Sequence, residues 1–459
     1  MLAVLVLLGL AALLACNSTY SASTDGLVIV PNLGSAAVQA FSFNLTNGHV
    51  STVNTAPSIL GQPTTMALDP SGNFAYVTVV PNAAVFQTLA LTSIATYTIN
   101  SDGTVAATGT PLTMLTLCPL ATAPPTWASC QAGSSGAGNL KPTAIAMDSA
   151  GKFLFVADQQ TSDSNGNAVP GSISVFSIGS GGTLTEVTGS PFTVPVLQSG
   201  PTTIANLVGL AVTPTKYPVL NTQAVQNAAC ALWQPLPAST PEYLYVTDSN
   251  NNVVWAFTVQ SSGVPALITN PQSGVVLTFP AASVTTGVAV DPCNRFVFVT
   301  NTDSNNVSAY AICNLTSPGR PAVCDSDTYP EGSLVQVPLS PFPLGGGPSG
   351  PNGPTVLAVD PLANFLYVVD QQSNQLSCFR ISGTTGSLAP LTPAVVNTGS
   401  NPVAIAIRAD DNWVFVTNNN PQNNLGVVSQ YELSPATGVL TPFGTGIQTE
   451  NYPTAVVVK

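Results

Sequence analysis

Residues 287–312 read "GVAVDPCNRFVFVTNTDSNNVSAYAI", and variants of this pattern recur along the whole chain. A short apolar run comes first and is followed by an Asp-Pro turn, an alternating aromatic and valine run, an Asn-rich turn and a third apolar run. Short runs of β-branched and aromatic residues, separated by Asp, Asn, Gly and Pro, are typical of strands joined by tight turns. The stretch therefore predicts antiparallel strands connected as hairpins.

The first run of this pattern has six copies. They occupy residues 63–69, 142–148, 207–213, 285–291, 354–360 and 402–408. Successive copies start 79, 65, 78, 69 and 48 residues apart, and a period of about 40–50 residues is typical of single propeller blades. The longer intervals contain inserted loops, of which the largest are 117–140, 214–241 and 314–331. A fourth run often follows a Gly turn, so each unit is predicted to contain four strands.

The two ends of the chain complement each other. Residues 26–53 contain runs two, three and four without a first run, whereas residues 453–459, "PTAVVVK", are a first run with nothing after it. The last strand is therefore predicted to complete the first blade, which closes the ring and removes exposed sheet edges. The predicted fold is all-β, a seven-bladed β-propeller of four-stranded antiparallel blades over residues 26–459. An eight-bladed ring is the alternative if the long first interval hides another unit.

The composition excludes some classes of function. Charged residues are only 6% of the chain and the net charge is −12, whereas typical soluble proteins contain about 25% charged residues. Nucleic-acid binding requires clustered Lys and Arg, and the eight cationic residues are scattered along the chain. The sequence therefore predicts no nucleic-acid partner, and it disfavours a phosphorylated substrate.

The N-terminus has the features of an export signal. Residues 1–15 are uninterruptedly apolar, but they are fewer than the roughly 20 that span a bilayer. Leu13-Leu14-Ala15-Cys16 resembles a bacterial lipobox, which implies that Cys16 is lipidated, although Leu14 is larger than usual and no Lys or Arg precedes the run. The predicted division is a signal peptide with lipobox over 1–16, a polar tether over 17–25 and the propeller over 26–459. An ordinary cleaved signal or a merely hydrophobic start are the alternatives.

Most of the eight cysteines are predicted to pair, because an exported protein can keep disulfides. The predicted pairs are Cys118–Cys130, Cys313–Cys324 and Cys230–Cys293. The first two pairs bracket inserted loops, and the third joins equivalent turns of adjacent blades. Cys378 lies inside a predicted strand and is expected to be a buried free thiol. No Cys-x-x-Cys spacing exists and the chain has one His, so a structural zinc site is disfavoured and no metal is predicted.

One repeat position, directly after the second run, carries Asp or Asn in five copies. These residues are Asp158, Asp248, Asn301, Asp370 and Asn418. By the symmetry of the repeat they are candidates for a ring near one face that binds a cation or sugar hydroxyls. The alternative, which we favour, is a turn-forming residue repeated blade by blade. A second such set, at the Asp-Pro turns, is predicted to form turns only: Asp69, Asp148, Asp291 and Asp360. No cofactor is predicted, and a structural or catalytic calcium is left open.

His49 is the sole His, and it follows an Asn-Gly turn in the predicted outer hairpin of the first blade. A solvated turn residue is a better interpretation than a catalytic base. Ser-His-Asp or Cys-His catalysis would need this residue, and its predicted place on the rim does not suit a central site.

The spacing "VDP-x-x-x-F-x-[YF]-V-[TV]-[ND]" resembles the YVTN-type propeller repeat and the lactonase-like propellers, which include 6-phosphogluconolactonase and carboxymuconate cyclases. The likeness covers residues 26–459 and implies the seven-bladed fold. Lactonase-like enzymes are understood to use acidic, His and Arg side chains around the central channel. No internal blade contains His, and Arg295 and Arg408 lie in turns, so that set is not matched residue by residue and the activity does not carry over with the fold.

The sequence predicts an exported, lipid-anchored propeller that acts as a binding or scaffold module in the bacterial cell envelope. We expect the protein to be a monomer that binds a protein or carbohydrate ligand. It would contact the membrane only through its N-terminal lipid. The alternative is a lactone hydrolase or cyclase, in which a carboxylate activates water to attack the lactone carbonyl. The first candidates for that carboxylate are Asp158, Asp248 and Asp370. A redox-cofactor propeller is a weaker third interpretation, since the Cys-x-x-Cys-His haem motif is absent.

Overall fold

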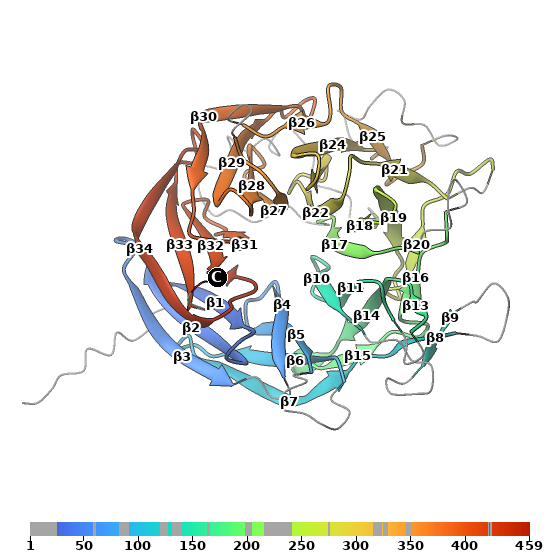
Figure 1. The fold of residues 1–459 in the computed structure, drawn as a ribbon. Coiled ribbons are helices and arrows are strands. Elements are labelled where there is room, and N and C mark those ends of the chain that lie inside the picture. The colour runs from blue at the N-terminus through green and yellow to red at the C-terminus, as the bar shows by residue number, and fades with distance from the viewer. Residues whose placement is uncertain are drawn as a thin grey trace, which may run out of the picture.

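A computed structural model of the chain contains seven antiparallel sheets arranged as blades around a central axis (Figure 1). We number the blades 1 to 7 in chain order. The structure describes residues 25–459 except 58–60, 82–90, 120–126, 131–139, 163–165, 198–203, 215–240, 274–275, 315–323, 325–328, 346–349, 421 and 423–424.

Each blade has four strands in order from the axis outward. The innermost strands of blades 1 to 7 are β35 (Val457–Val458), β4 (Gln62–Leu68), β10 (Pro142–Met147), β17 (Leu207–Val212), β22 (Thr285–Val290), β27 (Pro354–Val359) and β31 (Pro402–Ile407). The second strands are β1 (Asp25–Asn32), β5 (Phe74–Val80), β11 (Phe153–Asp158), β18 (Glu242–Asp248), β23 (Phe296–Asn301), β28 (Phe365–Asp370) and β32 (Trp413–Asn419). The third strands are β2 (Ala37–Asn44), β6 (Ser93–Ile99), β14 (Ser172–Ile178), β19 (Val253–Val259), β24 (Asn306–Ile312), β29 (Gln375–Ile381) and β33 (Leu425–Leu433). The outermost strands are β3 (Val50–Pro57), β7 (Val105–Thr113), β15 (Leu184–Glu186), β20 (Pro265–Leu267), β25 (Leu334–Gln336), β30 (Leu388–Asn397) and β34 (Leu440–Asn451).

Short additional strands extend this plan. In blades 3, 4 and 5 a second outer strand pairs with the third strand, namely β16 (Phe192–Thr193), β21 (Thr278–Pro280) and β26 (Phe342–Pro343). Two small hairpins lie in connecting loops, β8 (Thr116–Pro119) with β9 (Trp127–Cys130), and β12 (Thr161–Ser162) with β13 (Ala168–Val169). One 3₁₀ turn, η1 (Ser180–Gly182), lies between β14 and β15.

The hydrophobic core is divided into layers between neighbouring blades. The second strands β23 and β28 are buried along their whole length, which explains their continuous apolar and aromatic sequence. Between blades 5 and 6, for example, Phe296 and Phe298 pack with Leu366 and Val368. The outermost strand β34 is exposed along much of its length, so polarity increases outward from the second strand.

The two ends of the chain close the ring in blade 1, as predicted. Strand β1 pairs with β35, with Val28 opposite Val458. The backbone N–H of Leu27 donates to Lys459 O at 3.0 Å, and the N–H of Lys459 donates to Leu27 O at 2.8 Å. Since seven of the sheets in the described part of the chain are blades and the other two are the small hairpins, the seven-bladed prediction is confirmed and the eight-bladed alternative is wrong.

Threonine hydroxyls join the innermost layer of adjacent blades, which the sequence analysis did not foresee. Thr247 Oγ1 donates to Thr286 O of the next blade at 2.6 Å, and Thr300 Oγ1 donates to Thr355 O at 2.9 Å. Both donors lie in second strands, one residue before the repeated Asp or Asn. The Thr that ends "YVT" in blade 4 and "FVT" in blade 5 therefore bonds its blade to the next one, whereas Thr78 in blade 2 bonds to Thr64 and Thr65 of its own blade.

Candidate functional site

The two faces of the propeller differ in chemistry. We call the face where second strands end and innermost strands begin the amide face. The polar residues that directly follow the second strands there include Gln159, Gln160, Ser249, Asn250, Thr302, Gln371, Gln372 and Asn420. Apart from the buried strand-end residues Asp158, Asp248 and Asp370, the ionisable side chains within two described residues of these strand ends are Lys141 and Asp303. The amide face is therefore polar and nearly uncharged around the axis.

The five residues of the candidate ring lie at the amide face, but their side chains point into the interior of their own blades. All five are at most 1% exposed, and each side chain bonds within its own blade. Ser174 Oγ donates to Asp158 Oδ2 at 2.9 Å, and Ser377 Oγ donates to Asp370 Oδ2 at 2.7 Å. The repeat position therefore links the second strand to the third, which agrees with an architectural role rather than a ring around one ligand.

The Asn copies of this position make the same link. Asn301 Nδ2 donates to Ser308 Oγ at 2.9 Å, and Asn418 Nδ2 donates to Ser429 Oγ at 2.9 Å. The partner is a Ser of the third strand in both blades, as it is for the carboxyl groups of blades 3 and 6. The position therefore accepts either Asp or Asn without losing this bond.

Asp248 has a larger set of partners than the other four. Its carboxylate accepts the backbone N–H of Asn206 at 3.0 Å and of Asn250 at 3.2 Å, and the indole N–H of Trp255 at 3.1 Å. Asn250 Nδ2 in turn donates to Gln160 Oε1 of blade 3 at 2.6 Å. Asp248 therefore holds a cluster of amide side chains in place on the amide face without itself reaching the surface.

Two carboxyl groups of the set are strongly perturbed. Burial raises the pKa of Asp158 to about 8 and that of Asp370 to about 7, because the charged form loses its hydration and the single Ser partner compensates only in part. One oxygen of each, Asp158 Oδ1 and Asp370 Oδ1, is buried and has no hydrogen-bond partner. Both groups are therefore largely protonated up to about neutral pH.

The opposite face, which we call the turn face, carries the turns between the innermost and second strands. A cavity of about 590 Å³ opens there. The ends of innermost strands line it, including Val290, Val359, Ile407 and Val458, together with prolines of the turns. Its lining is apolar, in contrast to the amide face.

The Asp residues of the turn face form turns, as predicted. Asp291 Oδ1 accepts the N–H of Phe296 at 2.8 Å, and Asp360 Oδ1 accepts the N–H of Phe365 at 2.6 Å. Arg295 is buried, forms an ion pair with Asp291 at 2.7 Å and donates to Ala363 O of blade 6 at 3.1 Å. Arg295 therefore joins two blades and does not point into the channel.

The turn face also contains a buried carboxyl pair that the sequence analysis missed. Burial and the neighbouring carboxyl of Asp360 raise the pKa of Asp411, and burial raises that of Asp360. Asp360 Oδ2 and both carboxyl oxygens of Asp411 are buried and have no other partner. The pair lies between the turns of blades 6 and 7 and is expected to share a proton.

The remaining sequence predictions have mixed outcomes. His49 is exposed in the turn between β2 and β3, as predicted. Cys313 and Cys324 form a disulfide, and Cys378 is a buried free thiol, so both predictions are confirmed. Cys293 is disulfide-bonded, but its predicted partner Cys230 lies outside the described residues. Cys16, the proposed signal and residues 17–24 of the proposed tether also lie outside them, whereas Asp25 begins β1. The side chains of the predicted pair Cys118–Cys130 are also outside them.

Two searches of the described residues bear on metal and membrane. Within them, no three His, Cys, Asp or Glu side chains are placed to hold a metal ion. The same part of the chain contains no helix of sufficient length and apolarity to cross a membrane.

Comparisons with known proteins agree with this architecture. Residues 329–458 match the family described as "Lactonase, 7-bladed beta-propeller". The periplasmic gluconolactonase of Pseudomonas aeruginosa is 16% identical with a TM-score of 0.64, covering 95% of this chain and 99% of that chain. A Bacteroides fragilis protein provisionally named a 6-phosphogluconolactonase is 16% identical with a TM-score of 0.63, covering 96% of this chain and 99% of that chain. No curated protein matches the chain significantly. The resemblance seen in the sequence is thus confirmed, and the chain is a seven-bladed β-propeller of the lactonase-like fold.

Proposed function

We propose that this protein is an exported lactonase-like hydrolase that opens an uncharged sugar lactone at the amide face. The observation that carries this proposal is the correspondence of fold, along nearly the whole length of both chains, with one propeller named a gluconolactonase and another provisionally named a 6-phosphogluconolactonase. The shortage of charge at the amide face supports an uncharged substrate, since a phosphorylated one would need clustered cations. The apolar start of the chain supports export.

Asp303 is the carboxylate that we assign as the base. It is exposed and directly follows Thr302, whose hydroxyl donates to Pro354 O of the neighbouring innermost strand at 2.7 Å. Asp303 therefore lies in a loop that is bonded to β27, the innermost strand of blade 6. The three buried carboxyl groups proposed from the sequence do not reach solvent there.

The reaction is addition of water to the lactone carbonyl. Asp303 takes a proton as the water oxygen forms a bond to the carbonyl carbon, and the ring C–O bond then breaks. The departing ring oxygen receives the proton back, which gives a hydroxy acid that ionises and releases one proton to solvent. Amide and hydroxyl groups of the face donate hydrogen bonds to the sugar and to the carbonyl oxygen.

A sugar-binding module without turnover is the second candidate function. It is favoured by one observation, that no described His accompanies the carboxylate at the amide face, since His49 lies at the outer edge of blade 1. The protein would then hold a carbohydrate or a protein partner in the cell envelope through the same polar face.

Proton release during incubation with glucono-1,5-lactone tests the proposal. We expect ring opening well above the spontaneous rate, and little turnover of 6-phosphogluconolactone. A rate equal to that of buffer for a panel of neutral lactones, with and without calcium, would end the hydrolase proposal. Fractionation of the source cells tests export separately: full-length, unprocessed protein in the cytoplasm contradicts it.

A further inference from the structure

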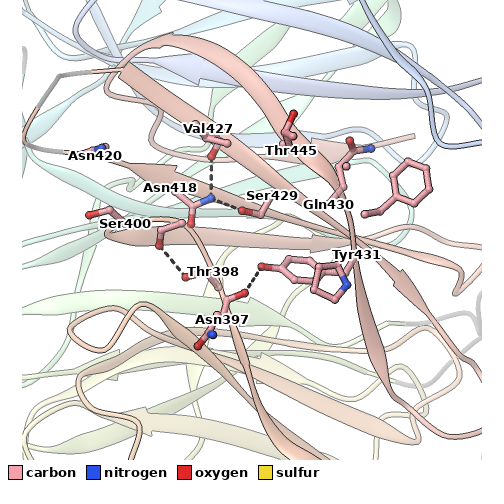
Figure 2. Close-up of a pocket in the computed structure, with 15 residues that line it drawn as sticks. Asn397, Thr398, Ser400, Asn418, Asn420, Val427, Ser429, Gln430, Tyr431 and Thr445 are labelled. Carbon is pink, nitrogen blue, oxygen red and sulfur yellow. Dashed lines mark hydrogen bonds between the residues drawn. The ribbon is translucent and has the colours of Figure 1, made fainter.

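We propose that a second, off-axis pocket, between blades 6 and 7, binds a neutral sugar. Figure 2 shows this pocket, which is formed by the end of β30, by β32 and β33, and by a bulge in β34. The proposal does not depend on lactone hydrolysis, because the assigned base Asp303 is not a pocket residue, and Asn420 is the one lining residue among the polar residues named as following the second strands at the amide face.

The pocket exists because the outermost strand leaves the sheet locally. Val428 pairs with Ile447 and Gln430 pairs with Phe443, so residues 444–446 lie opposite Ser429 alone. Gly444 and Gly446 have φ of +64° and +83°, values that Gly adopts without strain. The resulting cavity of about 370 Å³ lies within the roughly 300–1,000 Å³ of small-molecule sites.

Asn418 lies against this cavity with an unused acceptor. Its Nδ2 donates to Val416 O, Val427 O and Ser429 Oγ at 3.0, 2.9 and 2.9 Å. Its Oδ1 is buried without a partner and lies on the side of Ser400 (Figure 2). A buried carbonyl oxygen without a donor is costly, and a ligand hydroxyl in the pocket would satisfy it.

The walls combine neutral polar groups with an apolar surface. Hydroxyl and amide groups come from Thr398, Ser400, Asn420 and Thr445. Tyr431 and Pro442, which lie opposite each other in the ladder, supply the apolar part. The Tyr431 hydroxyl is already engaged, since it donates to Asn397 O at 2.8 Å, so its orientation is fixed.

The absence of charge among the lining residues selects the ligand class. All fifteen residues that line the pocket are uncharged, and the whole chain carries a net charge of −12. An anion would therefore enter without a cationic partner and against the field of the protein. A sugar matches the site, because it presents several hydroxyls together with an apolar C–H face.

A related bulge in blade 2 shows which part of the site is specific. There Ile94 pairs with Leu112 and Thr96 with Thr108, so residues 109–111 bulge opposite Ala95. The positions that correspond to Asn418 and Ser429 are Val79 and Ala95, which are both apolar and buried. Blades 2 and 7 thus share the bulge but differ in its floor, which is apolar in blade 2. In blade 7 the floor is the Asn–Ser form of the link that blades 3, 5 and 6 also contain.

Titration of the full-length protein with glucose and N-acetylglucosamine tests the proposal, with glucuronate as the anionic control. We expect a dissociation constant on the order of 1 mM for at least one neutral sugar, measured by calorimetry or saturation-transfer NMR, and binding of glucuronate at least tenfold weaker. Thr445→Trp fills the mouth from an exposed position, so it should fold and bind at least tenfold more weakly. Thr110→Trp, at the equivalent exposed position of the blade 2 bulge, should bind as the parent does.

Any one of three results would overturn the proposal. No binding of either neutral sugar at tens of millimolar, unchanged binding in Thr445→Trp, or equal binding of glucuronate would contradict it. Lactone turnover separates the two proposals, because Thr445→Trp should keep any turnover that the parent has. Sugar binding without turnover in the parent would leave this site standing and remove the hydrolase.

Discussion

Blades 4 and 6 place an Asp at the same repeat position, yet the two carboxyl groups behave differently. Asp248 accepts hydrogen bonds from backbone N–H groups and from the indole of Trp255, whereas Asp370 is bonded by Ser377 and keeps one oxygen without a partner. Asp248 accepts hydrogen bonds from several donors and organises a loop, while Asp370 is held neutral by burial. An identical residue at an identical repeat position therefore does not imply an identical role.

The largest expected effect comes from Asp248→Asn. The substitution replaces one carboxylate oxygen by an NH₂ group. At the Oδ1 position it faces the N–H groups of Asn206 and Asn250. At the Oδ2 position it faces Asn251 Nδ2 and Trp255 Nε1. Either way two donors lose their acceptor, and each buried donor left without a partner costs about 1–3 kcal/mol, so we expect the free energy of unfolding to fall by about 3 kcal/mol or more. Urea unfolding at pH 7 measures this. If the free energy of unfolding fell by less than about 1 kcal/mol, Asp248 in blade 4 would not differ in role from Asp370 in blade 6.

Asp370→Asn is expected to act in the opposite direction above neutral pH. The folded-state pKa of Asp370 is raised to about 7 from an unfolded value near 4, so the folded state binds more protons between these values. The stability that this group contributes is present below about pH 4 and is lost as the pH rises toward 7, at up to about 1.4 kcal/mol per pH unit.

The Asn variant lacks this titration and keeps the bond to Ser377, as Asn301 does with Ser308. Its stability relative to the parent should therefore rise from pH 4 to pH 8, as measured by urea unfolding at each pH. Asp158→Asn should show the same trend to about one pH unit higher, because the pKa of Asp158 is raised to about 8. A difference between variant and parent that stays constant with pH would contradict the assignment of neutral carboxyl groups.

The smallest effect is expected from Ser429→Ala. This removes one of the three acceptors of the Asn418 amide, while Val416 O and Val427 O remain. A single neutral hydrogen bond contributes about 1 kcal/mol, so we expect a loss of that size in the free energy of unfolding. Ser377→Ala is the matched variant in blade 6 and should cost more, because Asp370 Oδ2 would lose the Ser377 hydroxyl. Equal losses in the two blades would indicate that the carboxyl and amide versions of the link are equivalent.

The sequence was sufficient for the fold because each strand layer has its own pattern. Buried second strands read as "FVFVT" or "FLYVV", and the incomplete first and last units indicate closure of the ring. The sequence pattern could not show that the side chains of Asp158 and Asp370 point into their blades. Their partners Ser174 and Ser377 are determined by the register between the second and third strands.

Features that depend on neighbouring blades were also missed. The pairing of Asp360 with Asp411 and the Thr247 bond to the next blade join residues far apart in sequence. The bulge of β34 had a local signal in the Gly-Thr-Gly of residues 444–446, but strand pairing was needed to show that it opens a pocket.

The central claim is that lactone opening uses the exposed carboxylate of the amide face, while the buried carboxyl groups of the repeat position are architectural. The most direct test is to measure the turnover of glucono-1,5-lactone by the parent, Asp303→Asn and Asp370→Asn. We predict turnover in the parent, a loss of roughly 100-fold in kcat for Asp303→Asn, as expected when a general base is removed, and parental turnover for Asp370→Asn at pH 7. Parental turnover in Asp303→Asn, together with an inactive but folded Asp370→Asn, would contradict it.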